Sequence, residues 1–139
     1  MRKTARENAF KLIFEKLINE DSDELGYAAL TEGLDENDKN FLDTLLCGVE
    51  TEKEFLKSVV SRFLRGFNLD RIYKIDLAIL YVSCYEILFL ADVPDKVSVN
   101  EAVELAKTYS TDKSPAFVNG VLAGVIADKE EILNERNSD

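Results

Sequence analysis

Four basic side chains stand within the first eleven residues of the chain, against a single glutamate. They are Arg2, Lys3, Arg6 and Lys11, and they give this stretch a net charge of +3. Guanidinium groups offer paired donors to phosphates and flat faces to unstacked bases, so the cluster suits an RNA strand. The alternative is a terminus whose charges only improve solubility, and composition by itself favours that alternative.

An aromatic side chain follows the start of the last apolar segment, SPAFVNGVLAGVIA (114–127). Ser114 and Pro115 are typical of the first residues of a helix. Phe117 then lies about one turn in, beside a polar loop that carries Lys113. An aromatic at this position can stack on a base, worth about 1–3 kcal/mol, and the helix amides near Ser114 could receive a phosphate. The alternative is a core phenylalanine at the edge of the domain.

Two acids stand out by their positions, Glu86 and Asp76. Glu86 is the only charge between Leu77 and Ala91, so its burial requires an ionic or hydrogen-bonded partner and we expect a structural role. Asp76 precedes this run, and we expect it to be exposed. It would then share a surface, either partner-facing or simply solvated, with the neighbouring charges Asp70, Arg71 and Lys74.

The residues that most catalytic sites use are missing. The chain has no histidine, which is the commonest general base and transition-metal ligand. It also has no Gly-rich phosphate loop and no G-x-S-x-G motif. Cys47 and Cys84 form no C-x-x-C pair, and we expect both to be buried free thiols. The residues alone therefore leave an enzyme unsupported, and they indicate no metal or cofactor site.

The body of the chain is acidic. The net charge over 139 residues is −10, and residues 12–57 alone contribute −9. This argues against a protein that coats nucleic acid over its whole surface. A hydrophobic content of 46% with 32% charged residues is typical of a folded globular chain. No uncharged run is long enough to cross a bilayer and no signal peptide is present, so we expect a cytoplasmic protein.

Apolar residues at helical spacing predict where these side chains are held. Thr4 and Glu7 form a capping box for a first helix that runs to about residue 19. An acidic loop (20–24) separates it from a short helix at about 25–32. Asp35 then caps one long helix that ends near Arg65.

The second half of the chain continues the pattern. A helix starts at Asn68 or Asp70 and includes the apolar run 77–91, and a second capping box, Ser98 to Glu101, opens a helix to about residue 108. The last helix covers about 115–133. Repeats and alternating strand patterns are absent. We therefore predict an all-α fold, one compact domain over residues 1–139 with about six to seven helices.

One side of the last predicted helix carries only small residues, which are Ala116, Gly120, Ala123, Gly124 and Ala127. A bare side lets a neighbouring backbone approach closely. Although Asn119-Gly120 is also a turn signal, the helical spacing around it favours Gly120 as a packing residue inside a helix.

Four stretches of the sequence carry a family resemblance through their order and spacing. They are ARENAFKLIF (5–14), IDLAILYVSCYEILF (75–89), VPDKVSVNEAVELAK (93–107) and FVNGVL (117–122). The succession of NEAVELAK and FVNGVL is the most specific part. Over nearly its whole length the chain resembles the NusB family of bacterial transcription antitermination factors.

The resemblance implies an all-helical domain of two packed helical subdomains, about 1–66 and 67–134, followed by a polar tail at 135–139. It also implies binding to the boxA sequence of ribosomal RNA leader transcripts, by a protein that is not an enzyme and uses no cofactor. The implied partner is NusE, a small-subunit ribosomal protein, with other Nus factors and RNA polymerase completing an antitermination complex.

By residue match, the resemblance places RNA contacts on Arg2, Lys3, Arg6, Lys113 and Phe117, and a NusE-facing surface near Phe14 and Asp76. Thr4 replaces an arginine found in denser versions of the basic arm. Lys113 stands where the family can have an acid and adds positive charge to the same face. We expect RNA binding without a partner to be weak and salt-sensitive.

Two other functions are considered. A similar helical domain is appended to ribosomal RNA cytosine methyltransferases, but such a chain would continue into a parallel-sheet domain, and we expect none after Asp139. A purely protein-binding module would use its acidic surface to bind a basic partner, and RNA would then add nothing. A homodimer that buries the RNA face is also possible on this resemblance.

Overall fold

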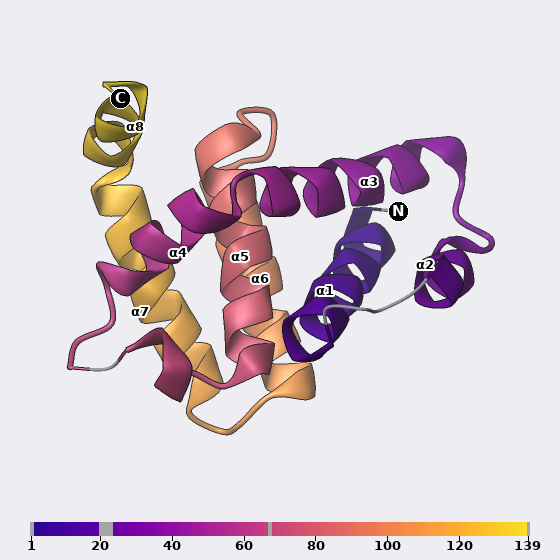
Figure 1. The fold of residues 1–139 in the computed structure, drawn as a ribbon, viewed down its shortest axis with the longest axis horizontal. Coiled ribbons are helices and arrows are strands. Elements are labelled where there is room, and N and C mark those ends of the chain that lie inside the picture. Colours follow the sequence, from indigo (N-terminus) through magenta and orange to yellow (C-terminus); the bar gives the residue numbers. More distant parts are fainter. Residues whose placement is uncertain (1, 20–23, 67, 139) are drawn as a thin grey trace.

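We describe the protein from a computed structural model that covers residues 2–19, 24–66 and 68–138. These residues form eight α-helices and one short 3-10 helix, with no strand (Figure 1), which confirms the all-α prediction. The elements are α1 (Arg2–Ile18), α2 (Glu24–Thr31), α3 (Glu36–Thr51), α4 (Lys53–Ser61), η1 (Leu69–Arg71), α5 (Lys74–Phe89), α6 (Asp95–Tyr109), α7 (Ser114–Ala127) and α8 (Lys129–Asn137).

Two helices that the sequence predicts as continuous are each divided by one residue. Glu52 separates α3 from α4, and Asp128 separates α7 from α8; both have backbone angles outside the helical range. Helix α8 is bonded to the first of these breaks, because the Arg136 guanidinium donates to both carboxylate oxygens of Glu52 at 3.1 and 2.8 Å. The predicted polar tail is thus partly helical, although Asp139 itself lies outside the described residues.

Of the three residues predicted to cap helices, Thr4, Asp35 and Ser98, one caps its helix and two do not. Asp35 caps α3 as predicted, its carboxylate accepting from the Asp38 amide at 2.8 Å. In contrast, Thr4 lies inside α1 and Ser98 inside α6, so neither opens its helix. The Ser98 hydroxyl instead donates to Glu86, 3.3 Å away on α5. Of the predicted acidic loop, residues 20–23 lie outside the described residues.

Helix α5 forms the centre of the molecule. Helices α1, α3, α4, α6 and α7 all pack against it (Figure 1), and every residue from Leu77 to Cys84 is buried, as the apolar run predicts. Burial raises the pKa of the Cys84 thiol to about 12, so this thiol stays protonated. Cys47 is exposed, which contradicts its predicted burial. None of the described helices has the length and apolarity needed to span a bilayer.

Two glycines within helices allow close packing, and a third does not. A side chain at Gly48 would overlap the Tyr85 ring, and one at Gly124 would overlap Phe63. Both positions therefore bring helices close together. At Gly120, however, an added Cβ would meet no atom within 4 Å. The packing role predicted for Gly120 is wrong; Gly124, one turn later, has that role.

Candidate nucleic-acid interface

The three cations at the start of α1 each contact an acid that is distant in the sequence. Arg2 pairs with Asp92 at 3.2 Å, and Lys3 pairs with Glu101 at 3.5 Å. Arg2 also lies over the Phe41 ring, 4.6 Å from its centroid. These two pairs are at the surface, so solvent weakens them and a ligand can compete for the cations.

The third pair, between Arg6 and Glu86, is buried. Arg6 donates to both carboxylate oxygens, with Nη2–Oε1 at 2.7 Å and Nε–Oε2 at 2.8 Å. The two residues are 4% and 0% exposed. The structural role predicted for Glu86 is therefore confirmed. Arg6, which the sequence assigned to the RNA-binding face, uses its guanidinium fork inside the protein to hold α1 on α5.

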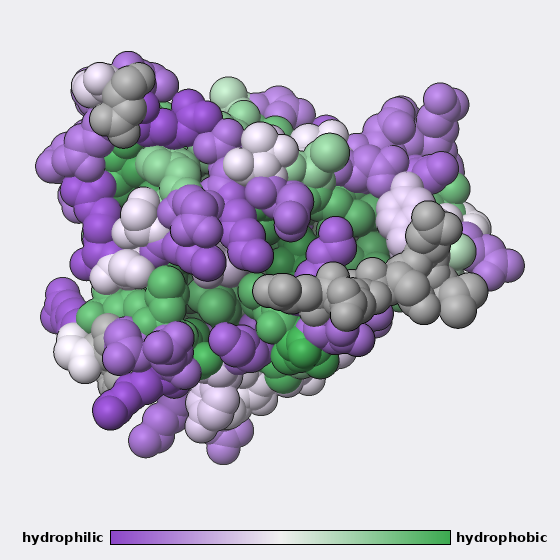
Figure 2. Space-filling view, in the orientation of Figure 1, coloured by the Kyte–Doolittle hydropathy of each residue, from purple (hydrophilic) through white to green (hydrophobic). Residues whose placement is uncertain are grey.

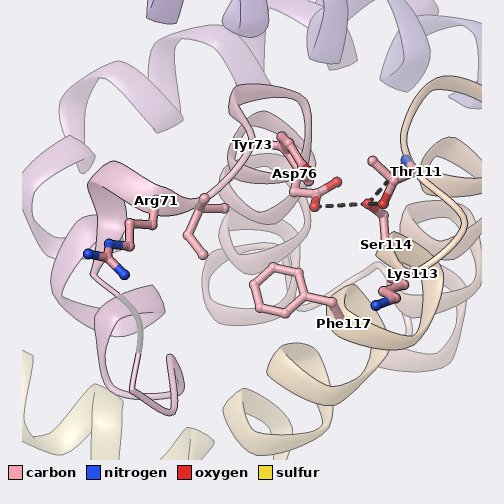
Figure 3. A pocket seen from close by; sticks show the side chains of 8 residues that line it. Arg71, Tyr73, Asp76, Thr111, Lys113, Ser114 and Phe117 are labelled. Carbon is pink, nitrogen blue, oxygen red and sulfur yellow. Dashed lines mark hydrogen bonds between the residues drawn. The ribbon is translucent and has the colours of Figure 1, made fainter.

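At the other end of α5, Phe117 and Lys113 line a small pocket of about 200 Å³ together with Arg71 and Tyr73. Figure 3 shows the Phe117 ring between the Arg71 side of the pocket and Lys113 at the start of α7. Tyr73 precedes α5, and its side chain is 63% exposed. Two aromatic residues and two cations thus line one pocket.

Asp76 fixes the shape of this pocket from inside. It is only 3% exposed, so the prediction of an exposed Asp76 is wrong. Its two carboxylate oxygens accept hydrogen bonds from the hydroxyls of Ser110 at 2.6 Å and Ser114 at 2.9 Å (Figure 3 shows the Ser114 bond). Ser114 also accepts from the Thr111 amide at 3.2 Å. These bonds join the start of α5 to the start of α7, and they place a negative charge where the α7 amides would otherwise attract a phosphate.

The cations around the pocket differ from those of α1 in having no acidic partner. Within the part of the chain that the structure describes, Arg65, Arg71, Lys74 and Lys113 form no ion pair. Their charge is therefore available to a ligand, and the aromatic rings beside it suit unstacked bases. The described residues also contain no group of three or more potential metal ligands.

The two cationic clusters do not form one corner of the molecule. Glu86, which holds Arg6, and Asp76, which holds Ser114, are ten residues apart on α5, or about 15 Å along the helix axis. The basic arm and the pocket therefore lie toward opposite ends of α5 (Figure 1). A strand that contacts both must extend along the protein.

The residues assigned to a partner surface are also arranged differently from the prediction. Phe14 is half-buried against the core, and Asp76 is inside the protein. The exposed apolar residue nearest to Phe14 in sequence is Ile18, at the end of α1, which is 60% exposed. Tyr73 and Ile18 are thus surface residues that sequence reasoning missed; each follows another apolar residue, Ile72 and Leu17 respectively, so the pattern does not mark it as exposed.

Comparison with known proteins gives a consistent assignment. The sequence model of the NusB family matches residues 3–127. The transcription antitermination protein NusB of Clostridium novyi is 44% identical over 129 residues, which cover 90% of this chain and 97% of that protein.

Solved structures agree with the sequence comparison. NusB of T. maritima superposes with a TM-score of 0.87 at 29% identity, covering 96% of this chain and 97% of that one. A crystal structure of the antitermination factors NusB and NusE in complex with dsRNA shares the fold, with a TM-score of 0.81 at 21% identity and coverage of 91% and 96%. Since the family match spans most of the sequence, this chain belongs to the NusB family.

Proposed function

We propose that this protein is a transcription antitermination factor that binds boxA RNA of ribosomal RNA leader transcripts together with NusE. The observation that carries the proposal is the pocket at the start of α7, where Phe117 and Tyr73 stand beside cations that have no acidic partner. Tyr73 is exposed and Phe117 is half-buried against the core, and stacking of bases on aromatic rings is typical of single-stranded RNA recognition. The curated relatives are transcription antitermination proteins.

The pocket residues would contact different parts of an RNA strand. Phe117 and Tyr73 would stack on bases, while Lys113 and Arg71 would contact phosphates. Arg2 and Lys3 would form a second contact region. They can bind phosphate only when it displaces their present partners, Asp92 and Glu101. Arg6 acts through α1, which it holds in place.

NusE would bind near the end of α1, around Phe14 and Ile18. The acidic charge of the chain, −10 overall, complements a basic ribosomal protein and increases the rate of encounter. The structurally similar NusB in the NusB–NusE–dsRNA crystal structure supports this pairing. Other Nus factors and RNA polymerase would join the complex thereafter.

The test is RNA binding by the parent protein and Phe117→Leu, with and without NusE. Leucine keeps an apolar side chain but loses the ring face, so we expect the affinity for single-stranded boxA RNA to fall by about tenfold. Phe89→Leu, at the opposite end of α5, is the matched control and should bind normally. Equal RNA affinity of all three proteins would contradict the proposal. If NusE bound and RNA added nothing, the protein-binding module would be the better description.

A further inference from the structure

A second and larger groove begins on the other side of Phe117. It has a volume of about 750 Å³ and lies between the end of α4 and helix α7. Its lining includes Phe63 and Arg65 from the α4 side and Ala116, Phe117 and Gly120 from α7. Because Phe117 also lines the pocket described above, one aromatic ring separates two neighbouring cavities.

The floor of the groove is open because its residues are small. Ala116, Gly120 and Ala123 are exposed on α7, and an added Cβ at Gly120 would meet no atom within 4 Å. On the same helix Gly124 already packs against Phe63, which closes one end. Figure 2 shows hydrophobic surface over the end of α4 and the segment that follows it, with hydrophilic side chains around it.

The charge on the wall of the groove is positive. Arg65 is exposed and forms no ion pair within residues 2–19, 24–66 and 68–138. Arg62 contributes less, because it pairs with Glu131 at 3.7 Å and with Glu135 at 3.1 Å. Together with Arg71 and Lys113, Arg65 extends the row of available cations past Phe117 and into the groove.

We propose that this groove is a second RNA subsite, an inference that rests on the function proposed above. The strand whose base stacks on Phe117 in the pocket continues over α7, and Arg65 contacts its phosphate backbone. Two observations favour RNA as the occupant: the groove adjoins the pocket, since Phe117 lines both, and its cation without an ion pair complements a phosphate. The subsite would bind nucleotides that flank the segment held in the pocket.

Gly120 provides a test that does not threaten the fold. Gly120→Leu fills the groove, and because the position is open and helical, the substitution should raise helix stability. The probes are a 12-nucleotide single-stranded boxA RNA and the same RNA extended by six nucleotides at each end, measured by fluorescence anisotropy. We expect Gly120→Leu to weaken the extended RNA by about tenfold, the equivalent of one stacking contact, and to leave the short RNA unchanged.

Arg65→Gln tests the charge separately. Loss of one phosphate contact should lower the slope of log affinity against log salt by about 0.7 for a single strand, and only with the extended RNA. Gly120→Ala, which leaves the groove open, and Lys39→Gln, which removes an exposed charge on α3, are the matched controls. Both should behave like the parent protein.

The outcomes separate the two proposals. If Phe117→Leu weakened both RNAs while Gly120→Leu and Arg65→Gln changed neither, the groove proposal would be overturned and the proposed function would stand. If Gly120→Leu altered NusE binding or self-association but not RNA affinity, a protein would occupy the groove, which also overturns it. Absence of RNA binding by the parent protein, even with NusE, would remove both.

Discussion

The two ends of α5 carry similar numbers of cations, but within the described residues only the cations near the start of α7 lack an acidic partner. At the start of α1, the side chains of Arg2, Lys3 and Arg6 each face a carboxylate. Around the start of α7, Arg71 and Lys113 face an open pocket and have no such partner in the described structure. The cations at the first end hold a helix in place, whereas those at the second end are not used in this way.

The difference teaches that a count of basic residues does not measure available positive charge. The +3 of residues 1–11 is offset locally by acids from α5, α6 and the loop between them. A buried pair such as Arg6–Glu86 is especially inaccessible, because taking one member away leaves an uncompensated charge in the interior. Four sets of variants test this difference between the two ends, and the expected effect decreases from the first set to the last.

Glu86→Ala should have the largest effect. It leaves the Arg6 guanidinium buried without its partner, and we expect the free energy of unfolding to fall by about 3–5 kcal/mol, measured by urea denaturation. Asp92→Ala, which removes the exposed partner of Arg2, should cost less than about 1 kcal/mol. Equally small losses in both variants would show that the arm is not anchored through Glu86.

Asp76→Ala tests the pocket end in the same way. It removes the acceptor of two hydroxyl hydrogen bonds and leaves Ser114 buried without that partner. We expect a loss of about 1–3 kcal/mol in thermal or urea unfolding. Asp76→Asn keeps one acceptor oxygen and should lose less. An unchanged stability in Asp76→Ala would mean that the link between α5 and α7 is not required.

Neutralising one cation at each end compares their availability directly. Lys113→Gln should lower the salt slope of RNA binding by about 0.7, since it removes one phosphate contact. Lys3→Gln should lower it less, because Glu101 already occupies Lys3. Titrations across salt concentration would show this. A larger change in Lys3→Gln would reverse the comparison.

Glu101→Gln should have the smallest effect, and in the opposite direction. It frees Lys3 from an exposed pair whose strength is below about 1 kcal/mol, so RNA affinity should rise by less than about fivefold. Glu104→Gln, which removes a neighbouring surface acid paired with Lys107, is the control. A decrease in affinity for Glu101→Gln would show that the glutamate itself contacts the ligand.

Much of the fold could be predicted because it depends on local patterns. The apolar run before and after Glu86 predicted a buried helix, and Asp35 predicted the cap of α3. The breaks at Glu52 and Asp128 could not be predicted, since the apolar spacing continues across both. Ser98 resembles a cap in sequence, but a tertiary partner on α5 uses its hydroxyl instead.

The candidate site was predicted only where local sequence patterns position its residues. Phe117 and Lys113 were placed at a helix start by local signals, and they do line a pocket. The burial of Arg6 depends on Glu86, 80 residues away, and the burial of Asp76 depends on Ser114. Tyr73 gave no signal, because one aromatic residue ahead of a helix has no period to follow.

The ion pair between Arg136 and Glu52 has a consequence for the C-terminal end of the chain. Arg136 also lies over the rings of Phe55 and Phe89, 5.5 and 5.0 Å from their centroids. Although its composition is polar, α8 therefore packs on the break between α3 and α4 and stabilises it through Arg136. Deleting the last turns of α8 would remove Arg136 and its bonds to the break between α3 and α4. A truncation at this end is therefore not neutral for the packing of the rest of the protein.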